Sequence, residues 1–129
     1  MVTKMTKKVL VIEDDTAMLD ILSTKLGMAG LKVIKAQDGE EGLRLAQTEL
    51  PDIILLDLVL PKMSGLDMLD ALRNGEQGKS IPVFILTNLN ENSSIYKSVA
   101  LHTEAYFIKS NDSLEHIVTE VKNKLQPAK

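Results

Sequence analysis

The chain has 129 residues, of which 44% are hydrophobic and 26% charged, and this size and composition predict one globular domain with a buried core. The absence of cysteine excludes disulfides, thiolate metal sites and thiol nucleophiles. A net charge of −3 and only two Tyr and two Phe argue against nucleic-acid binding, which needs a basic face or a stacking platform. No apolar stretch has the length of a membrane span or a secretory signal, so we expect a cytoplasmic protein.

Five short apolar runs, rich in Val and Ile, divide the chain. They are Val9–Ile12, Leu31–Ala36, Ile53–Leu56, Val83–Leu86 and Ala105–Ile108. Several are apolar at consecutive rather than alternate positions, which is typical of strands covered on both faces. The runs therefore predict five strands.

The segments between these runs have the spacing of amphipathic helices. The clearest apolar stripe predicts the last helix and consists of Leu114, Ile117, Val118, Val121 and Leu125. Residues that cap helices stand at the predicted starts. We expect Asp14 or Asp15 to cap the first helix, Ser64 the third, and Asn111 or Asp112 the last.

Strand and helix alternate five times, which predicts an α/β fold with a doubly wound, five-stranded parallel sheet. The handedness of the crossovers favours the flavodoxin-like (βα)5 arrangement with strand order 2-1-3-4-5. Ligands bind such sheets at the carboxyl ends of strands 1 and 3. We expect one domain over residues 1–129, with flexible ends at 1–7 and 126–129.

Acidic residues follow the first and third predicted strands, namely Glu13, Asp14 and Asp15 after the first and Asp57 after the third. Taken alone, helix capping explains the first group and a turn explains Asp57. Capping does not explain why both groups fall at the predicted ligand crevice. Carboxylates this close repel one another, so either some are protonated or a cation lies among them. Oxygen ligands at an open edge suit Mg²⁺ or Mn²⁺, and we predict a metal site.

A hydroxyl and an ammonium group stand at the ends of the last two predicted strands. Thr87 ends the fourth strand and Lys109 the fifth. Separately, a turn and a surface ion pair would explain them. Together with the acids and a cation they predict a site for a phosphoryl group. Asp57 is the candidate acceptor because a carboxylate is nucleophilic without a base, and an acyl phosphate suits a transient signal.

These motifs resemble the receiver (response-regulator) domain of two-component signalling, over essentially the whole chain. Val11–Asp15 is similar to the family's first acidic motif. Asp57–Gly65 matches its phosphorylation loop, D-x-x-[ML]-P-x-M-x-G, at every defined position. Thr87, Lys109 and Tyr106 fall where the family has its hydroxyl, its lysine and its switch aromatic.

The resemblance implies roles for the residues of the acidic site. Asp57 would accept a phosphoryl group from a sensor histidine kinase or a histidine phosphotransfer protein. Asp14 and Asp57 would bind Mg²⁺ directly, with the backbone carbonyl of Val59, and Glu13 would act through a metal-bound water. The chain would catalyse its own phosphotransfer and slow dephosphorylation, without turnover of external substrates.

The resemblance also implies a switch. Thr87, the Asn88 backbone and Lys109 would bind the phosphoryl oxygens. Movement of Thr87 would let the Tyr106 ring turn inward and reshape the face of the fourth helix, fifth strand and fifth helix, which would bind a downstream protein. The chain would act either by itself, as a monomer or weak dimer, or as the receiver of a longer protein, with no nucleic acid or membrane as its direct partner.

Four departures from the family pattern affect the expected coupling and timing of the switch more than the expected phosphoryl chemistry. Asn88 replaces a small residue, and His102-Thr103 replace Gly-Ala before the fifth strand. Ser110 replaces the usual proline, and a cis bond before a non-proline residue costs about 3 kcal/mol. The segment Asn88–Ser94 contains three Asn and is expected to form a mobile loop.

Two apolar residues near the predicted site favour a long-lived phosphorylated form. Val59 and Leu89 each lie two residues past a site residue, Asp57 and Thr87 respectively. An apolar side chain cannot orient an attacking water. We therefore expect slow self-dephosphorylation.

Three other functions fit parts of the sequence. A phosphatase of the haloacid-dehalogenase type also uses an Asp nucleophile and Mg²⁺, but its general-acid Asp would stand where this chain has Val59. A flavodoxin-type module would place a flavin phosphate against the acids, which would repel it. A docking module that works without phosphorylation would be expected to lack the chemical residues, and they are present.

Overall fold

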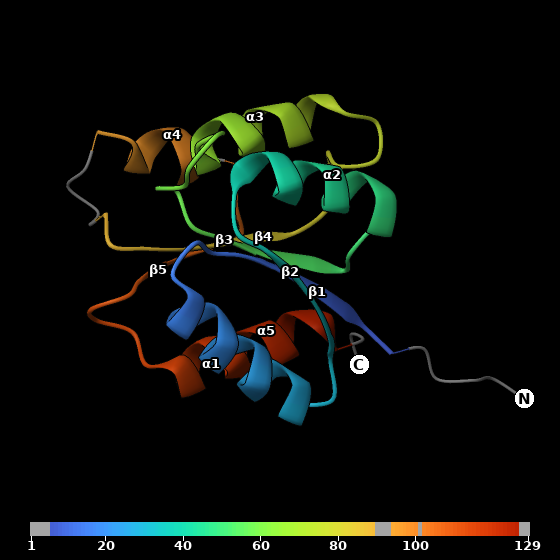
Figure 1. Cartoon of the computed structure of the whole chain (residues 1–129), viewed down its shortest axis with the longest axis vertical. Coiled ribbons are helices and arrows are strands. Elements are labelled where there is room, and N and C mark those ends of the chain that lie inside the picture. Colours follow the sequence, from blue (N-terminus) through green and yellow to red (C-terminus); the bar gives the residue numbers. More distant parts are fainter. Residues whose placement is uncertain (1–5, 90–93, 101, 127–129) are drawn as a thin grey trace, which may run out of the picture.

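The computed structural model describes residues 6–89, 94–100 and 102–126. Residues 1–5 and 127–129 of the expected flexible ends, and residues 90–93 of the expected mobile loop, lie outside this described part. Five parallel strands form one sheet in the order β2-β1-β3-β4-β5, which confirms the predicted fold. Figure 1 shows α1 and α5 on one face of this sheet and α2, α3 and α4 on the other.

The elements alternate along the chain as predicted. The strands are β1 (Lys8–Ile12), β2 (Lys32–Ala36), β3 (Ile53–Leu56), β4 (Val83–Thr87) and β5 (Ala105–Ile108). The helices are α1 (Thr16–Met28), α2 (Gly39–Glu49), α3 (Gly65–Asn74), α4 (Tyr96–Ala100) and α5 (Leu114–Leu125). Among the described residues, no helix combines the length and apolar character needed to cross a bilayer.

Helices bury both faces of the sheet, which explains the uninterrupted apolar runs. In β1, Leu10 and Ile12 belong to the core on the side of α2, α3 and α4, whereas Val9 and Val11 belong to the core on the side of α1 and α5. Strands β3 and β4 alternate in the same way. A strand with two buried faces has no polar side, so its sequence shows no alternation.

The predicted caps of α1 and α3 are confirmed. The Asp15 side chain accepts a hydrogen bond from the Met18 amide, and the Ser64 hydroxyl accepts one from the Asp67 amide. Each bond satisfies a backbone donor that the first turn of a helix leaves without a partner. Strand β2 begins at Lys32, one residue later than the apolar run indicated.

The predicted cap of the last helix is wrong. Helix α5 is capped by Ser113, whose hydroxyl accepts from the His116 amide, and not by Asn111 or Asp112. The Asp112 carboxylate instead accepts a hydrogen bond of 2.8 Å from the Ile108 amide at the end of β5. Because this carboxylate holds the strand end, the helix begins after the next residue that offers a side-chain oxygen.

The strand register brings the predicted site residues to one edge of the sheet. Ile12 of β1 lies opposite Leu56 of β3, and the Asp57 amide donates to the Ile12 carbonyl at 3.1 Å. The next residues along the two strands, Glu13 and Asp57, are therefore neighbours. On the other side, the Lys109 amide donates to the carbonyl of Thr87 at 2.8 Å, which continues the pairing of β4 with β5.

We predict that Ser23→Ala stabilises the protein. Ser23 in α1 is 9% exposed, and its hydroxyl finds no hydrogen-bond partner within the described residues. A buried unpaired hydroxyl costs about 1–3 kcal/mol, so its removal should raise the free energy of unfolding by about 1 kcal/mol beyond the gain in helix propensity, measured by urea denaturation. The neighbour Thr24 is the control, because it is exposed and Thr24→Ala raises helix propensity without removing a buried hydroxyl. Equal effects of the two variants would contradict the prediction.

Candidate functional site

Three carboxylates meet at the carboxyl ends of β1 and β3. Glu13 is 2% exposed and Asp57 is 5% exposed, whereas Asp14 faces solvent. Each offers an oxygen, and these three oxygens lie within 4.8 Å of one another. The structure thus brings together the acids that the sequence predicts to share a crevice, because β1 and β3 are neighbours in the sheet.

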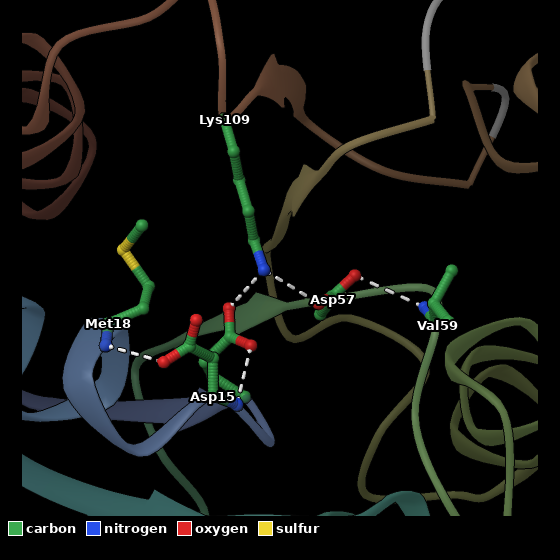
Figure 2. Close-up of polar contacts among 6 residues, drawn as sticks. Asp15, Met18, Asp57, Val59 and Lys109 are labelled. Atoms are coloured by element: carbon green, nitrogen blue, oxygen red, sulfur yellow. Dashed lines mark hydrogen bonds and ion pairs between the residues drawn. The ribbon is translucent and has the colours of Figure 1, made fainter.

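The ammonium group of Lys109 lies between the two buried carboxylates. Its Nζ is 2.6 Å from Oε1 of Glu13 and 2.8 Å from Oδ2 of Asp57. Figure 2 shows the long side chain reaching down from the end of β5 toward Asp57. One cation thus compensates two adjacent anions, at an edge where only 12% of the lysine side chain is exposed.

Burial and charge shift the pKa values of this group in directions that the geometry explains. Burial raises the pKa of the Glu13 carboxyl, and this effect outweighs the hydrogen bonds from Lys109 and from the Asp15 backbone. Burial alone would lower the pKa of Lys109. The hydrogen bonds and charges of Asp57 and Glu13 outweigh it, so the Lys109 pKa is raised and the side chain remains a cation.

Backbone contacts fix the orientation of the two buried carboxylates. The Asp15 amide donates to Oε2 of Glu13 at 3.0 Å, and the Val59 amide donates to Oδ1 of Asp57 at 3.1 Å. In each carboxylate the amide thus holds one oxygen and the Lys109 ammonium holds the other. At Gly65, the first residue of α3, a Cβ atom would lie 2.2 Å from the Asp57 carbonyl, so glycine lets α3 begin against the strand end.

Thr87, at the end of β4, contributes a buried hydroxyl. Its relative exposure is 0%, and its Oγ1 makes no hydrogen bond within the described part of the chain. Strand β4 lies between β3 and β5, so Thr87 stands between the strand that leads to Asp57 and the one that leads to Lys109. A buried hydroxyl donor at the same edge of the sheet as a charged cluster is suited to a ligand with acceptor oxygens.

The donor set fits a hard divalent cation. Carboxylate oxygens are the ligands that Mg²⁺ prefers, and Mg²⁺ keeps several waters when it binds to protein. Two buried acids and the solvent-facing Asp14 offer both features. The cluster of Glu13, Asp14 and Asp57 therefore has the composition of a site that could bind a metal ion.

Tyr106 lies apart from the acids, on β5, and is joined to the segment that follows β4. Its hydroxyl donates to the carbonyl of Leu89 at 2.8 Å. Its ring packs edge-on against Tyr96 of α4, with the ring centroids 4.8 Å apart. The sequence reasoning missed Tyr96, since a single aromatic residue in a polar segment gives no signal of this contact.

Three of the residues that depart from the family pattern lie at the surface. Asn88, His102 and Ser110 are exposed. Arg73 of α3 donates two hydrogen bonds to the His102 carbonyl, at 3.1 and 2.7 Å, and so ties the α4–β5 connection to α3. The described residues contain no cis peptide bond, so the bond between Lys109 and Ser110 is trans.

The chain belongs to the response regulator receiver domain family, whose sequence model matches residues 9–122. This agrees with the predicted family and fold. Solved receiver domains have a similar fold. A CheY-like receiver domain protein from Methanospirillum hungatei has a TM-score of 0.83 at 26% identity, with 94% of each chain covered. Chemotaxis response regulator CheY4 of Vibrio cholerae has a TM-score of 0.82 at 27% identity, over 94% of this chain and 100% of that one.

Curated proteins with similar sequences include transcriptional regulators. The alkaline phosphatase synthesis transcriptional regulatory protein PhoP of Bacillus subtilis is 37% identical over 81% of this chain and 43% of its own length. The DNA-binding dual master transcriptional regulator RpaA of Synechocystis is 44% identical over 65% of this chain and 35% of its own length. The chain thus spans less than half the length of these relatives.

We predict that Lys109→Met destabilises the protein when no divalent cation is added. The variant keeps most of the apolar stem but leaves Glu13 and Asp57 buried side by side without a cation. Breaking a buried ion pair by removing one partner costs several kcal/mol, and for this partly exposed edge we expect about 2–3 kcal/mol by urea denaturation. The control is Lys124→Met, which removes a surface pair to Glu104 at 3.2 Å and should cost less than about 1 kcal/mol. Equal losses would contradict the prediction.

Proposed function

We propose that the chain is a phosphorylation-activated signalling switch that accepts a phosphoryl group on Asp57 in a Mg²⁺-dependent reaction. The observation that carries this proposal is the position of the Lys109 ammonium, within hydrogen-bond distance of both Asp57 and Glu13 at an edge of the sheet that also holds Asp14. A nucleophile, a set of cation ligands and a fixed positive charge are then all present. Membership of the receiver family supports the same function.

The proposed chemistry is a transfer from phosphohistidine to carboxylate. An oxygen of Asp57 attacks the phosphorus atom, a P–O bond forms, the P–N bond breaks, and its electron pair remains on the imidazole nitrogen. Lys109 and the hydroxyl of Thr87 donate to the phosphoryl oxygens, with the Asn88 amide as a further donor. When bound, Mg²⁺ would neutralise charge on these oxygens.

The proposed metal ligands come from two strand ends and the segment after β3. Asp14, Asp57 and the backbone carbonyl of Val59 would bind the cation directly, and Glu13 would act through water. Val59 follows Asp57 by two residues, and its amide already holds the Asp57 carboxylate at 3.1 Å. This hydrogen bond holds the Val59 backbone, and with it the proposed carbonyl ligand, close to the Asp57 carboxylate at the end of β3. Mn²⁺ has similar ligand preferences and is an alternative.

A short covalent path connects the proposed phosphoryl site to Tyr106. Thr87 donates to the new phosphoryl group, and Leu89, two residues later, carries the carbonyl that Tyr106 contacts. A movement of Thr87 therefore pulls on the backbone that holds the Tyr106 ring and, through ring packing, on Tyr96 of α4. We propose this as the switch that changes the face of α4, β5 and α5.

The proposed partners are a sensor histidine kinase or a histidine phosphotransfer protein as phosphoryl donor, and a downstream protein or domain at the Tyr106 face. We propose a cytoplasmic, single receiver domain that is a monomer or weak dimer, does not turn over external substrates, and catalyses only its own phosphotransfer and slow dephosphorylation. Relatives that are transcriptional regulators make control of transcription one such output.

We predict that acetyl phosphate with Mg²⁺ adds one phosphoryl group to the wild-type chain and none to Asp57→Asn, measured as intact mass. The variant keeps the size of the side chain but removes its nucleophilic oxygen. Asp70→Asn, at an exposed position of α3, is the matched control and should be labelled as the wild type is. Chelation of Mg²⁺ should abolish labelling. Labelling of the Asp57 variant, or of neither protein, would refute the proposal.

We predict that Val59→Asn combined with Leu89→Glu accelerates loss of the phosphoryl group. The Val59 side chain is 61% exposed beside Asp57, where a polar group would reach a water in the crevice. We expect roughly a tenfold faster release of phosphate, below the full effect of a positioned acid–base group. The control is Ile21→Asn, an equally apolar-to-polar change at an exposed position of α1. Unchanged release by the double variant would show that water orientation does not set the lifetime.

A further inference from the structure

The segment that joins β3 to α3, residues 57–64, has a strained backbone. The Met63 amide donates to the Pro61 carbonyl at 2.8 Å, which closes a γ-turn with Lys62 at its centre. The φ angle of Lys62 is 67°, in the left-handed region that a residue with a Cβ atom rarely adopts. The Gly65 amide also donates to the Leu58 carbonyl at 3.0 Å and closes the segment into a loop.

This strained turn packs directly against the start of α2. At Gly39 a Cβ atom would lie 1.9 Å from the Met63 carbonyl oxygen, so the two backbones approach as closely as glycine alone allows. The neighbouring Asp38 carboxylate lies 3.8 Å from the Lys62 ammonium. Its other oxygen caps α2 by accepting from the Glu41 amide at 2.8 Å. The turn at Lys62 therefore packs against the capped first turn of α2.

The helix start is held from both sides. The Glu41 side chain accepts a hydrogen bond of 3.1 Å from the amide of Gln37, the residue before Asp38, while the Glu41 amide donates to the Asp38 side chain. This pairing satisfies two backbone donors and fixes how the chain enters the helix. A strained backbone persists only where its surroundings impose it, and here the imposing element is the α2 start.

From this we propose that Asp38 and Gly39 are positioning residues for the proposed phosphoryl-acceptor site. Asp38 caps the start of α2, and Gly39 lets that start press against the Met63 backbone, which clamps the γ-turn and thereby sets where the segment places the Val59 carbonyl. The inference rests on the proposed function, in which that carbonyl is a metal ligand. Neither residue belongs to the acidic cluster of Glu13, Asp14 and Asp57. Their effect is on Mg²⁺ affinity, through the path of the backbone between Asp57 and Gly65.

The test is a Mg²⁺ titration of the full chain, followed by the amide NMR signals of Val59 and Met63. In Gly39→Ala the new methyl group overlaps the Met63 carbonyl and must push the segment away. Loss of a group that orients a metal ligand typically weakens affinity by roughly 10–100-fold, and we expect about tenfold. The control is Gly78→Ala, whose Cβ would lie 2.6 Å from the Leu72 carbonyl, in the α3–β4 connection at the opposite edge of the sheet. It should lose stability but bind Mg²⁺ within about twofold of the wild type.

A second variant keeps the test decisive if Gly39→Ala does not fold. Lys62→Gly removes the steric cost of the positive φ, so it should unfold at a higher urea concentration than the wild type. Because the backbone contact between Gly39 and Met63 holds the turn, and the exposed Lys62 ammonium adds only a pair of 3.8 Å to Asp38, the Mg²⁺ affinity of this variant should stay within about twofold of the wild type. A loss of more than about fivefold would overturn the inference, since the lysine itself would then fix the segment.

The outcomes separate this inference from the proposed function. A wild-type chain that binds Mg²⁺ and is phosphorylated, together with a folded Gly39→Ala variant that binds Mg²⁺ equally well, overturns the positioning role alone. A wild-type chain that neither binds Mg²⁺ nor becomes phosphorylated overturns the proposed function and the inference with it. Weaker Mg²⁺ binding by Gly39→Ala but not by Gly78→Ala, at matched folded fraction, supports the clamp.

Discussion

Two carboxylates, Glu13 and Asp57, are buried side by side at the carboxyl edge of the sheet, and one ammonium group, that of Lys109, lies within 2.8 Å of both. Without this cation the two acids would repel each other at a place where water screens them poorly. The arrangement requires that β1, β3 and β5 end at the same level. It also requires a side chain long enough to pass over β4, which separates β5 from β3 in the sheet. The hydroxyl of Thr87, buried and without a hydrogen-bond partner among the described residues, stands at the end of this intervening strand.

The sequence predicted the fold because its strands are buried on both faces. Consecutive apolar residues with capped amphipathic segments between them leave few arrangements other than a doubly wound parallel sheet. The same topology then predicted that Glu13 and Asp57 would meet, because the carboxyl ends of adjacent parallel strands lie at one edge. The proximity of Lys109 was predictable for the same reason. The register of the strands places Glu13, Asp57 and Lys109 at this edge, and the apolar pattern of each strand determines the register.

The features that the sequence did not predict depend on contacts between elements distant in the chain. Asp112 looked like a helix cap, but its carboxylate serves the end of β5, and a local pattern cannot show which of two backbone donors a carboxylate will choose. The positive φ of Lys62 contradicts the preference of lysine, and the contact of this turn with the α2 start joins segments that are distant in the sequence. The edge-on packing of Tyr96 on Tyr106 likewise joins α4 to β5 across a segment whose sequence has no periodic pattern.

The two roles proposed for Asp57 cannot be separated. Its carboxylate is the hydrogen-bond partner of Lys109 in the unmodified chain, and it is also the proposed acceptor. A phosphoryl group on one of its oxygens would therefore necessarily change the ion pair that compensates Glu13, and it would add acceptor oxygens beside a Thr87 hydroxyl that has no other partner within the described residues. The charges that stabilise this edge of the sheet in the unmodified chain are thus the ones that phosphorylation would rearrange. Because Leu89 is two residues from Thr87 and holds the Tyr106 hydroxyl, such a rearrangement would reach the surface of α4 and β5 without any long-range relay.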